Sequence, residues 1–359
     1  MEVPWGSEGA IYERASLNAT FFGTTRGPFR HDPRHAGEQG NFPVTSHPGL
    51  PDLAEVERAA IRIRGLVVET PLLPLRMHGA DLWLKCESLQ TGGSFKLRGA
   101  SNRLALLDAA ERAAGVVAFS SGNHAQGVAI AAARLGIRAT IVMPSDAPRL
   151  KVDGTRAQGA EVHFYDRVTE DRVAIAAAIA GERGAVLVPS FDDRHIVAGQ
   201  GSAGIEARAQ CPEPIRRIVT CCGGGGLAAG LSLSCPGAET IVVEPEGWDD
   251  MARSLSAGRI EPVGPNPPPT SCDALQTPLV SPITFAILHS AGASGVAVSE
   301  AEVREAVRFA WTSFAMVLEP GGAAALAAML AGKVAPTPGT VVMLTGSNMD
   351  PALHRAWVA

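Results

Sequence analysis

Short apolar runs alternate with longer, alanine-rich stretches over most of this chain. Runs of four or five apolar residues are typical of strands buried on both faces of a parallel sheet, and the stretches between them are long enough for helices. The runs lie at 115–119, 139–143, 185–188, 217–220, 240–243 and 340–344. This order predicts βαβ units, and with them an α/β fold of open, mostly parallel sheets flanked by helices.

An amphipathic helix is predicted before the first of these runs. Its apolar residues recur at helical spacing, and the pattern stops at Gly65. These residues are Leu53, Val56, Ala60 and Ile63. Residues 1–50 follow no helical or strand period and hold seven glycines and five prolines, so we expect an irregular or disordered tail there. The tail lacks the apolar segment of a signal peptide, and its acidic residues argue against a transit peptide.

Length and composition exclude several classes of protein. With 359 residues the chain is long enough for two domains, and its 46% hydrophobic residues favour large cores. A net charge of −5 gives no basic surface for nucleic acid or anionic lipid, and no apolar run is long enough to span a bilayer. The six cysteines form no C-x-x-C pair, which is typical of buried thiols in a reducing compartment. We therefore expect a cytoplasmic enzyme with a small-molecule substrate.

Lys96 is the residue with the most informative surroundings. It lies between Phe95 and Leu97, just after the glycine pair at 92–93. Apolar neighbours on both sides are unusual for a solvated surface charge, and glycines let a ligand approach the backbone closely. A partly desolvated amine loses proton affinity and becomes a nucleophile toward an aldehyde. The sequence thus indicates a reactive lysine.

Two loops that follow predicted strands also carry binding chemistry. The first, SSGNHAQG at 120–127, offers hydroxyls, an amide and the N–H groups of a helix start, which suit a carboxylate and a polar ring substituent. The second, GGGGLAAG at 223–230, can direct backbone N–H groups at a phosphate. The second loop also fits a dinucleotide-binding pattern, because Gly223, Gly225 and Ala228 match G-x-G-x-x-A and Glu244 ends the next strand. By itself it does not separate these two cofactor classes.

An acidic turn follows the strand at 240–243. Glu244 and Asp250 lie six positions apart around a glycine-containing turn that includes Trp248. Carboxylate and carbonyl oxygens in this arrangement can bind a hard divalent cation, although a solvated acidic turn has the same pattern. No histidine pair has the spacing of a transition-metal site.

Seven motifs, taken in order, resemble the fold-type II pyridoxal-phosphate enzymes, and within them the threonine/serine dehydratase and serine racemase family. They are LKCESLQ (84–90), SFK (94–96), SGNH (121–124), GQG (199–201), GGGG (223–226), EPGGA (319–323) and TGSN (345–348). The resemblance implies a large pyridoxal-phosphate-binding domain (51–114 and 193–359), a small domain (115–192) and a cofactor in the cleft between them. It also implies a homodimer or homotetramer.

The resemblance assigns roles around pyridoxal 5'-phosphate. Lys96 would bind the cofactor covalently and act as base at Cα, Phe95 would pack near the ring, and Asn123 would contact the ring hydroxyl. Thr345 would face the ring nitrogen, with Ser347 as the other candidate. A neutral hydroxyl there leaves the ring a weaker electron sink, which favours prompt β-elimination. The phosphate would bind at Gly223, Gly224, Gly225, Gly226 and Leu227.

The remaining implied roles concern substrate and metal. The substrate carboxylate would bind at Ser120, Ser121, Asn123 and His124. Ser121 could also be the acid/base of a racemase on the face opposite Lys96. A Mg²⁺ or Ca²⁺ ion would bind at Glu244, Asp250 and the carbonyl of Trp248.

Together these observations predict a pyridoxal-phosphate-dependent ammonia-lyase of the threonine/serine dehydratase type, which converts a β-hydroxy amino acid to a 2-oxo acid and ammonia. An amino-acid racemase with the same site is the first alternative, and an NAD-dependent dehydrogenase built on the loop at 223–230 is the second. The substrate could be threonine, serine, threo-3-hydroxyaspartate or another hydroxy amino acid, and specificity is expected in the loop at 271–275. A C-terminal regulatory domain is not expected.

Overall fold

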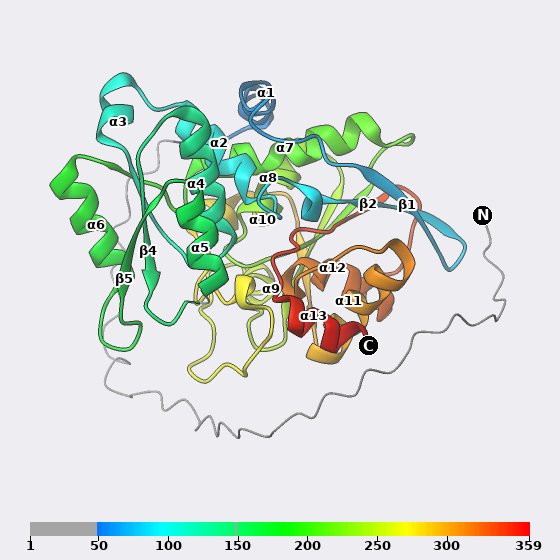
Figure 1. Cartoon of the computed structure of the whole chain (residues 1–359). Coiled ribbons are helices and arrows are strands. Elements are labelled where there is room, and N and C mark those ends of the chain that lie inside the picture. Colours follow the sequence, from blue (N-terminus) through cyan, green and yellow to red (C-terminus); the bar gives the residue numbers. More distant parts are fainter. Residues whose placement is uncertain (1–48, 148) are drawn as a thin grey trace, which may run out of the picture. The chain divides into compact units, whose positions relative to one another are not determined.

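The computed structural model describes residues 49–147 and 149–359, so the predicted tail lies almost entirely outside it. The described residues fall in one compact unit, His47–Ala359, which contains two β-sheets flanked by helices (Figure 1). The predicted α/β class is confirmed. None of the helices in the described part of the chain is long and apolar enough to cross a membrane.

The larger sheet has six strands in the order β1-β2-β10-β7-β8-β9. The strands are β1 (Leu72–Met77), β2 (Ala80–Lys85), β7 (Arg217–Cys221), β8 (Glu239–Pro245), β9 (Ser294–Val298) and β10 (Thr340–Met343). β1 pairs antiparallel with β2, and all other neighbours are parallel. The carboxyl ends of β7, β8 and β10 therefore meet at one edge of the sheet, where the loops that follow them lie close together.

The smaller sheet has four parallel strands in the order β5-β4-β3-β6. They are β3 (Val116–Phe119), β4 (Ala139–Pro144), β5 (Glu161–Tyr165) and β6 (Val186–Leu187). Alternate residues of β3 point to opposite faces, as the strand period requires: Val116 packs with helix α4 (Asn123–Leu135) and Val117 with helix α6 (Arg172–Arg183). All four strands lie within the predicted small domain, 115–192, whose boundaries stay a prediction.

The remaining helices connect and cover the sheets. They are α1 (Leu53–Arg62), α2 (Lys96–Ala105), α3 (Ala109–Ala114), α5 (Arg149–Ala157), α7 (Arg194–Gln210), α8 (Gly226–Ser234), α9 (Asp250–Ala257), α10 (Pro282–Ser290), α11 (Glu300–Phe314), α12 (Pro320–Leu330) and α13 (Pro351–Val358), with short 3₁₀ turns at Glu87–Leu89 and Asp273–Leu275. α1 confirms the helix expected from the spacing that begins at Leu53. Asp52 caps it by accepting a hydrogen bond from Glu55 N at 2.8 Å.

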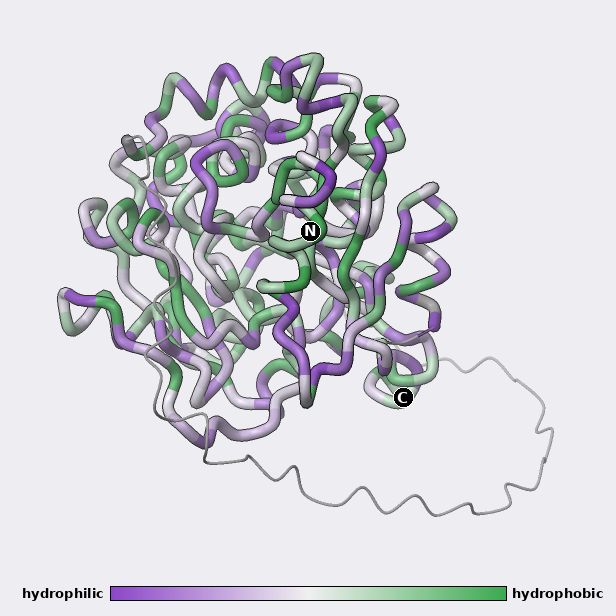
Figure 2. Tube along the Cα trace, turned by 90° about the vertical axis from the view of Figure 1, so that its left-hand side faces the viewer, coloured by the Kyte–Doolittle hydropathy of each residue, from purple (hydrophilic) through white to green (hydrophobic). Residues whose placement is uncertain are grey.

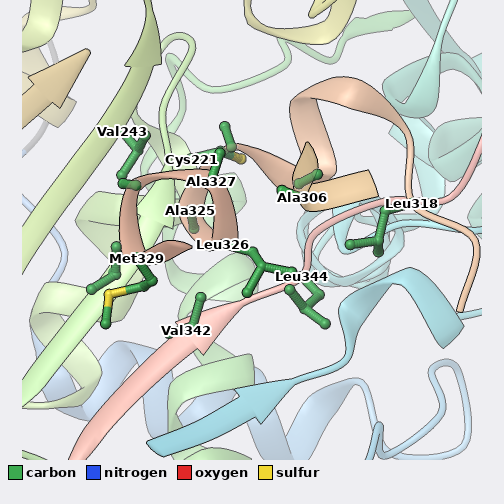
Figure 3. Close-up of a cluster of buried hydrophobic side chains, with 14 of the residues drawn as sticks. Cys221, Val243, Ala306, Leu318, Ala325, Leu326, Ala327, Met329, Val342 and Leu344 are labelled. Carbon is green, nitrogen blue, oxygen red and sulfur yellow. The ribbon is translucent and has the colours of Figure 1, made fainter. Parts of the chain in front are cut away.

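The main core lies against α12. This helix is buried along nearly its whole length because alanines, Leu326 and Met329 occupy all its faces. Figure 3 shows its side chains between Val243 of β8, Val342 of β10 and Ala306 of α11. Along the chain trace, hydrophobic segments run through the interior, while many outer turns are hydrophilic (Figure 2).

α2 and α7 cross at two glycines. A Cβ on Gly199 would lie 2.7 Å from the Cα of Gly99, a separation that real Cβ atoms do not show. Gln200 supports the crossing, since its Oε1 accepts a hydrogen bond from Gly99 N at 3.0 Å. The GQG motif is thus explained by close helix packing.

A buried ion-pair network also joins these two helices. Arg98 of α2 is fully buried and pairs with Glu87 at 2.7 Å and with Glu206 of α7 at 2.6 Å. Lys85 pairs with Glu206 at 2.8 Å. Although burial alone would raise it, the adjacent Arg98 holds the pKa of Glu87 below its usual range. The network ties the end of β2 and α7 to the first turn of α2.

Candidate active site

Lys96, the lysine predicted to be reactive, is the first residue of α2 and lies next to the end of β10. Ser94 forms an isolated antiparallel bridge with Gly346, and the N–H of Phe95 donates to the carbonyl of Thr345 at 3.2 Å. The N–H of Ser347 donates in turn to Gly93 at 2.8 Å. The SFK and TGSN motifs, distant in sequence, are therefore held together by backbone hydrogen bonds.

The Lys96 amine has the surroundings expected of a nucleophile. Its Nζ donates to the carbonyl oxygen of Ser190 at 3.3 Å and lies 5.1 Å from the centre of the Phe95 ring. Burial lowers the pKa of Lys96 to about 8, and the partial charges of Cys221 and Glu319 offset only part of this effect. A carbonyl and a ring face can stabilise an ammonium ion, but neither neutralises it.

The SGNH turn connects β3 to α4. Ser120 Oγ accepts a hydrogen bond from Gly122 N at 3.1 Å, and both Ser120 and Ser121 remain partly exposed. Asn123 is the first residue of α4, and it is buried. Its Nδ2 donates to Glu319 Oε1 at 2.6 Å. The turn thus presents two serine hydroxyls beside a buried amide.

His124 differs from its predicted role. It is buried, and its Nε2 lies 2.9 Å from the carbonyl oxygen of Val188, which can only accept a hydrogen bond. Burial, with Lys96 nearby, lowers the pKa of His124 to about 4, so the ring is neutral and its Nδ1 carries no proton to donate. The imidazole is therefore a poor carboxylate ligand. Its backbone N–H, in the first turn of α4, has the polarity for that role.

The four glycines of the predicted phosphate loop lie close to neighbouring side chains: a Cβ would collide at Gly224 and Gly225 and would make a tight contact at Gly223 and Gly226. Gly225 has φ +85°, and a Cβ there would lie 2.7 Å from Met251 Cε. A Cβ on Gly224 would collide with the ring of Phe191, and one on Gly223 would lie 3.0 Å from Thr277 Oγ1. The loop leads directly into α8, which begins at Gly226. A glycine cradle at a helix start fits the phosphate group of the predicted cofactor.

Phe95 and Leu227 belong to one apolar cluster. Both are buried and pack with Ile218 of β7 and Met343 of β10. The cluster joins the turn that carries Lys96 to the first turn of α8. Lys96 and the glycine loop are therefore both anchored to the same packed side chains.

The two hydroxyls proposed for the ring nitrogen have different partners. Ser347 Oγ donates to the carbonyl of Ser88 at 2.8 Å. Thr345 Oγ1 lies 3.1 Å from Cys221 Sγ, a contact in which either atom can donate. Burial raises the pKa of Cys221 to about 11, so the sulfur is a neutral thiol. Thr345 is consequently the hydroxyl with the weaker competing partner.

The acidic turn contains two buried carboxyl groups. Glu244 accepts backbone hydrogen bonds from Met251 at 3.1 Å and Ala252 at 2.8 Å, while neither oxygen of Asp250 has a hydrogen-bond partner. Burial raises the pKa of Asp250 to about 7, and burial together with Asp250 raises the pKa of Glu244 well above its usual value. Two orphaned oxygens beside a second carboxylate fit a bound cation. No cluster of three or more His, Cys, Asp or Glu side chains that could hold a metal occurs among residues 49–147 and 149–359.

Sequence reasoning assigned no role to three residues that contact the site: Ser190, Phe191 and Glu319. Ser190 and Phe191 lie in the irregular segment between β6 and α7, where no motif draws attention to them. Glu319 precedes α12 in the EPGGA motif, and burial raises its pKa to about 7, with Asp273 adding to the effect. A glutamate that directly precedes a buried, apolar helix was the available signal.

The geometry also bears on the dehydrogenase alternative. In a dinucleotide-binding unit the acidic residue at the end of the second strand binds a ribose. Here the Glu244 side chain is completely buried and accepts hydrogen bonds from the start of α9. It is not available to a ribose, so the glycine loop is better explained as a phosphate cradle.

Comparison with known proteins gives the same result. Residues 63–346 match the family model described as pyridoxal-phosphate dependent enzyme. The chain is 42% identical to an L-threo-3-hydroxyaspartate ammonia-lyase of Pseudomonas sp, over 82% of this chain and 95% of that protein. It is 37% identical to an L-threonine ammonia-lyase of Thermotoga maritima, over 84% of this chain and 76% of the relative. Its fold matches that of maize serine racemase with a TM-score of 0.80 and 31% identity, over 86% and 97% of the two chains. The family match spans Lys96 and the glycine loop, and the chain belongs to the pyridoxal-phosphate dependent enzymes.

Proposed function

We propose that this protein is a pyridoxal-phosphate-dependent ammonia-lyase that converts a β-hydroxy amino acid to a 2-oxo acid and ammonia. The observation that carries the proposal is the buried Lys96 amine with its depressed pKa, because the adjacent Phe95 packs in one apolar cluster with Leu227 of the glycine loop. Lys96 also lowers the pKa of His124, in the helix start that follows the hydroxyls at 120–121. Relatives with ammonia-lyase names support it.

The glycine loop, Thr345 and Lys96 have separate roles in this proposal. Gly223 to Gly226 and the first turn of α8 would hold the cofactor phosphate, and Thr345 would face the ring nitrogen. When bound, the cofactor supplies an electron sink for the electrons left at Cα. Lys96 is the nucleophile that binds the cofactor and the base that takes the Cα proton, which its low pKa favours near neutral pH.

The substrate is expected to enter between the turn at 120–124 and the loop at 271–275. Ser120, Ser121 and the N–H groups at the start of α4 suit the substrate carboxylate. The second loop adjoins the phosphate cradle, since a Cβ on Gly223 would lie 3.3 Å from the carbonyl oxygen of Ala274. Its Asp273 pairs with Lys151 of α5 at 2.9 Å. This loop is where we expect selectivity among threonine, serine and 3-hydroxyaspartate to arise.

We further propose that Glu244, Asp250 and the Trp248 carbonyl bind Mg²⁺ or Ca²⁺ in a structural role. Two adjacent buried carboxylates are costly unless a cation or protons neutralise them, and hard oxygen ligands favour these two ions. A cytoplasmic location and a homodimer or homotetramer remain expectations from the sequence.

One assay tests the activity. Purified protein loaded with pyridoxal phosphate is incubated with each L-β-hydroxy amino acid, and 2-oxo acid and enantiomer composition are measured together. We expect 2-oxo acid from at least one substrate, and no product from Lys96→Ala, with Lys333→Gln as a surface lysine control. Interconversion of enantiomers faster than 2-oxo acid release by the wild-type protein would favour the racemase.

A further inference from the structure

Three side chains, one of which affects the pKa of Lys96, form a directional series of hydrogen bonds. Asn348 Nδ2 donates to the carbonyl oxygen of Gly92 at 2.8 Å and to Asn123 Oδ1 at 2.7 Å. Asn123 Nδ2 donates to Glu319 Oε1 at 2.6 Å. The three side chains come from the turn after β10, the start of α4 and the residue before α12. They meet only in the folded protein.

The contact between Asn348 and Gly92 sets the direction of the whole hydrogen-bond series. A backbone carbonyl can only accept, so the Asn348 atom that faces Gly92 must be the amide nitrogen. That nitrogen has a second hydrogen, which it donates to Asn123. The atom of Asn123 on this side is therefore its oxygen.

Glu319, at the other end of the series, requires the same orientation of the Asn123 amide. When it is ionised, as it is above its pKa of about 7, the Glu319 carboxylate only accepts, so it then requires the nitrogen of Asn123 on its side. Both ends thus select one orientation of the Asn123 amide. In this orientation one of its two N–H groups is bound to Glu319, and the other is not used by either partner.

Glu319 is itself held firmly. It is 5% exposed, and its backbone N–H donates to Gly346 at 3.0 Å. Its Oε1 lies so close to Gly346 that a Cβ there would collide with it. A carboxyl group with so little freedom can fix the group that it binds.

We propose that Glu319 and Asn348 are positioning residues that orient the Asn123 amide so that it offers an N–H, and never its carbonyl oxygen, to the cofactor ring hydroxyl. Neither residue needs to touch the substrate. The inference rests on the proposed contact between Asn123 and the ring hydroxyl. A donor at that position favours the ionised form of the hydroxyl, whereas a carbonyl oxygen would repel it.

Isosteric variants test the orientation. In Glu319→Gln either amide atom can face Asn123, and in Asn348→Asp a carboxylate accepts where an N–H donated, so each variant favours or permits the reversed Asn123 amide. Asn123→Ala removes the contact itself, and Glu161→Gln, on the surface of β5, is the matched control. Asn348→Ala replaces Asn348→Asp if the latter does not fold.

The readouts are the affinity of the cofactor-free protein for pyridoxal phosphate, the absorption spectrum of the bound cofactor and the melting temperature. We expect Glu319→Gln and Asn348→Asp to weaken affinity roughly tenfold and to shift the spectrum in the same direction as Asn123→Ala. If Asn123→Ala leaves spectrum and affinity unchanged, the proposed ring contact is wrong. If Asn123→Ala changes both but the variants at 319 and 348 keep wild-type values, the contact stands and the positioning role is wrong.

Discussion

Thr345 Oγ1 and Cys221 Sγ lie 3.1 Å apart at the ends of two neighbouring parallel strands. A neutral thiol is a weak partner, so the threonine hydroxyl remains available to a ligand. Thr345→Val removes the hydroxyl at nearly constant volume, and we expect a shifted cofactor spectrum and weaker cofactor affinity. Ser347→Ala should instead keep the spectrum and lower the free energy of unfolding by about 1 kcal/mol, because it removes the hydrogen bond to Ser88. The opposite pattern would assign the ring nitrogen to Ser347.

The Lys96 amine should control the pH dependence of cofactor capture. Its pKa of about 8 lies below that of a free lysine, so roughly a tenth of the amine is neutral at pH 7, against less than a thousandth for an ordinary lysine. Only the neutral amine attacks an aldehyde. After mixing cofactor-free protein with pyridoxal phosphate, the rate at which the visible band appears should rise with pH through about 8 and then level. A midpoint near 10 would show that the amine is fully solvated.

The acidic turn should make stability depend on a divalent cation. Chelation should lower the melting temperature of the wild-type protein, and Mg²⁺ or Ca²⁺ should restore it, because the cation neutralises two buried carboxylates. Asp250→Asn removes one negative charge and keeps the shape, so its melting temperature should no longer respond to either treatment. Asp249→Asn, at the more exposed neighbouring position, is the control and should respond like the wild type. A wild-type protein that ignores the chelator would contradict the cation site.

Ser121 should separate elimination from racemisation. If the protein is mainly a lyase, Ser121→Ala should retain most 2-oxo acid formation and lose no more than roughly tenfold in kcat/KM, the effect of one carboxylate-binding hydroxyl. Any D-isomer formed by the wild type should disappear in the same variant. Loss of all 2-oxo acid formation in a folded, cofactor-loaded variant would instead place Ser121 in the elimination step.

The ion-pair network behind α2 should dominate the effect of substitutions there. Arg98→Leu leaves Glu87 fully buried beside an apolar side chain, and breaking a buried pair in this way costs about 3–5 kcal/mol. Urea denaturation measures the loss. Arg183→Leu removes the exposed pair with Glu161 and should change stability little. Equal effects of the two substitutions would show that Arg98 is hydrated in solution.

Most of the strands that the sequence missed lie at the edges of the sheets. All six predicted runs became strands, and most of them are buried on both faces. Four strands were missed: β1, β5 and β9, which are edge strands, and β2, which lies between β1 and β10 in the larger sheet. An edge strand buries few residues and so lacks a continuous apolar run: only Tyr165 of β5 and Val298 of β9 are fully buried.

The hairpin of β1 and β2 was not predicted, because its turn has an uncommon sequence. The strands are joined by His78 and Gly79, both with positive φ, at 48° and 83°. A two-residue hairpin turn of this kind is usually signalled by Asn-Gly or Asp-Gly. Pro74 also weakened the strand pattern, although an edge strand tolerates proline.

In the site, too, short sequence motifs could be predicted, whereas contacts between residues distant in sequence could not. Lys96 and the glycine loop could be predicted because each is defined by a short motif. The bond between Glu319 and Asn123 spans 196 positions, so only the fold reveals it. The contact between His124 and the distant carbonyl of Val188 was also not visible in the sequence, and the role of a histidine depends on which nitrogen carries the proton.

The glycine crossing of α2 and α7 limits how this scaffold could be re-engineered. With Gly99 and Gly199 in backbone contact, the two helices cannot come closer together, and any larger residue at either position would force them apart. Lys96 is the first residue of α2, so we expect the backbone on the lysine side of the site to tolerate little movement. We expect variants selected for bulkier substrates to accumulate changes at 271–275 and at 149–157, and to leave the crossing untouched.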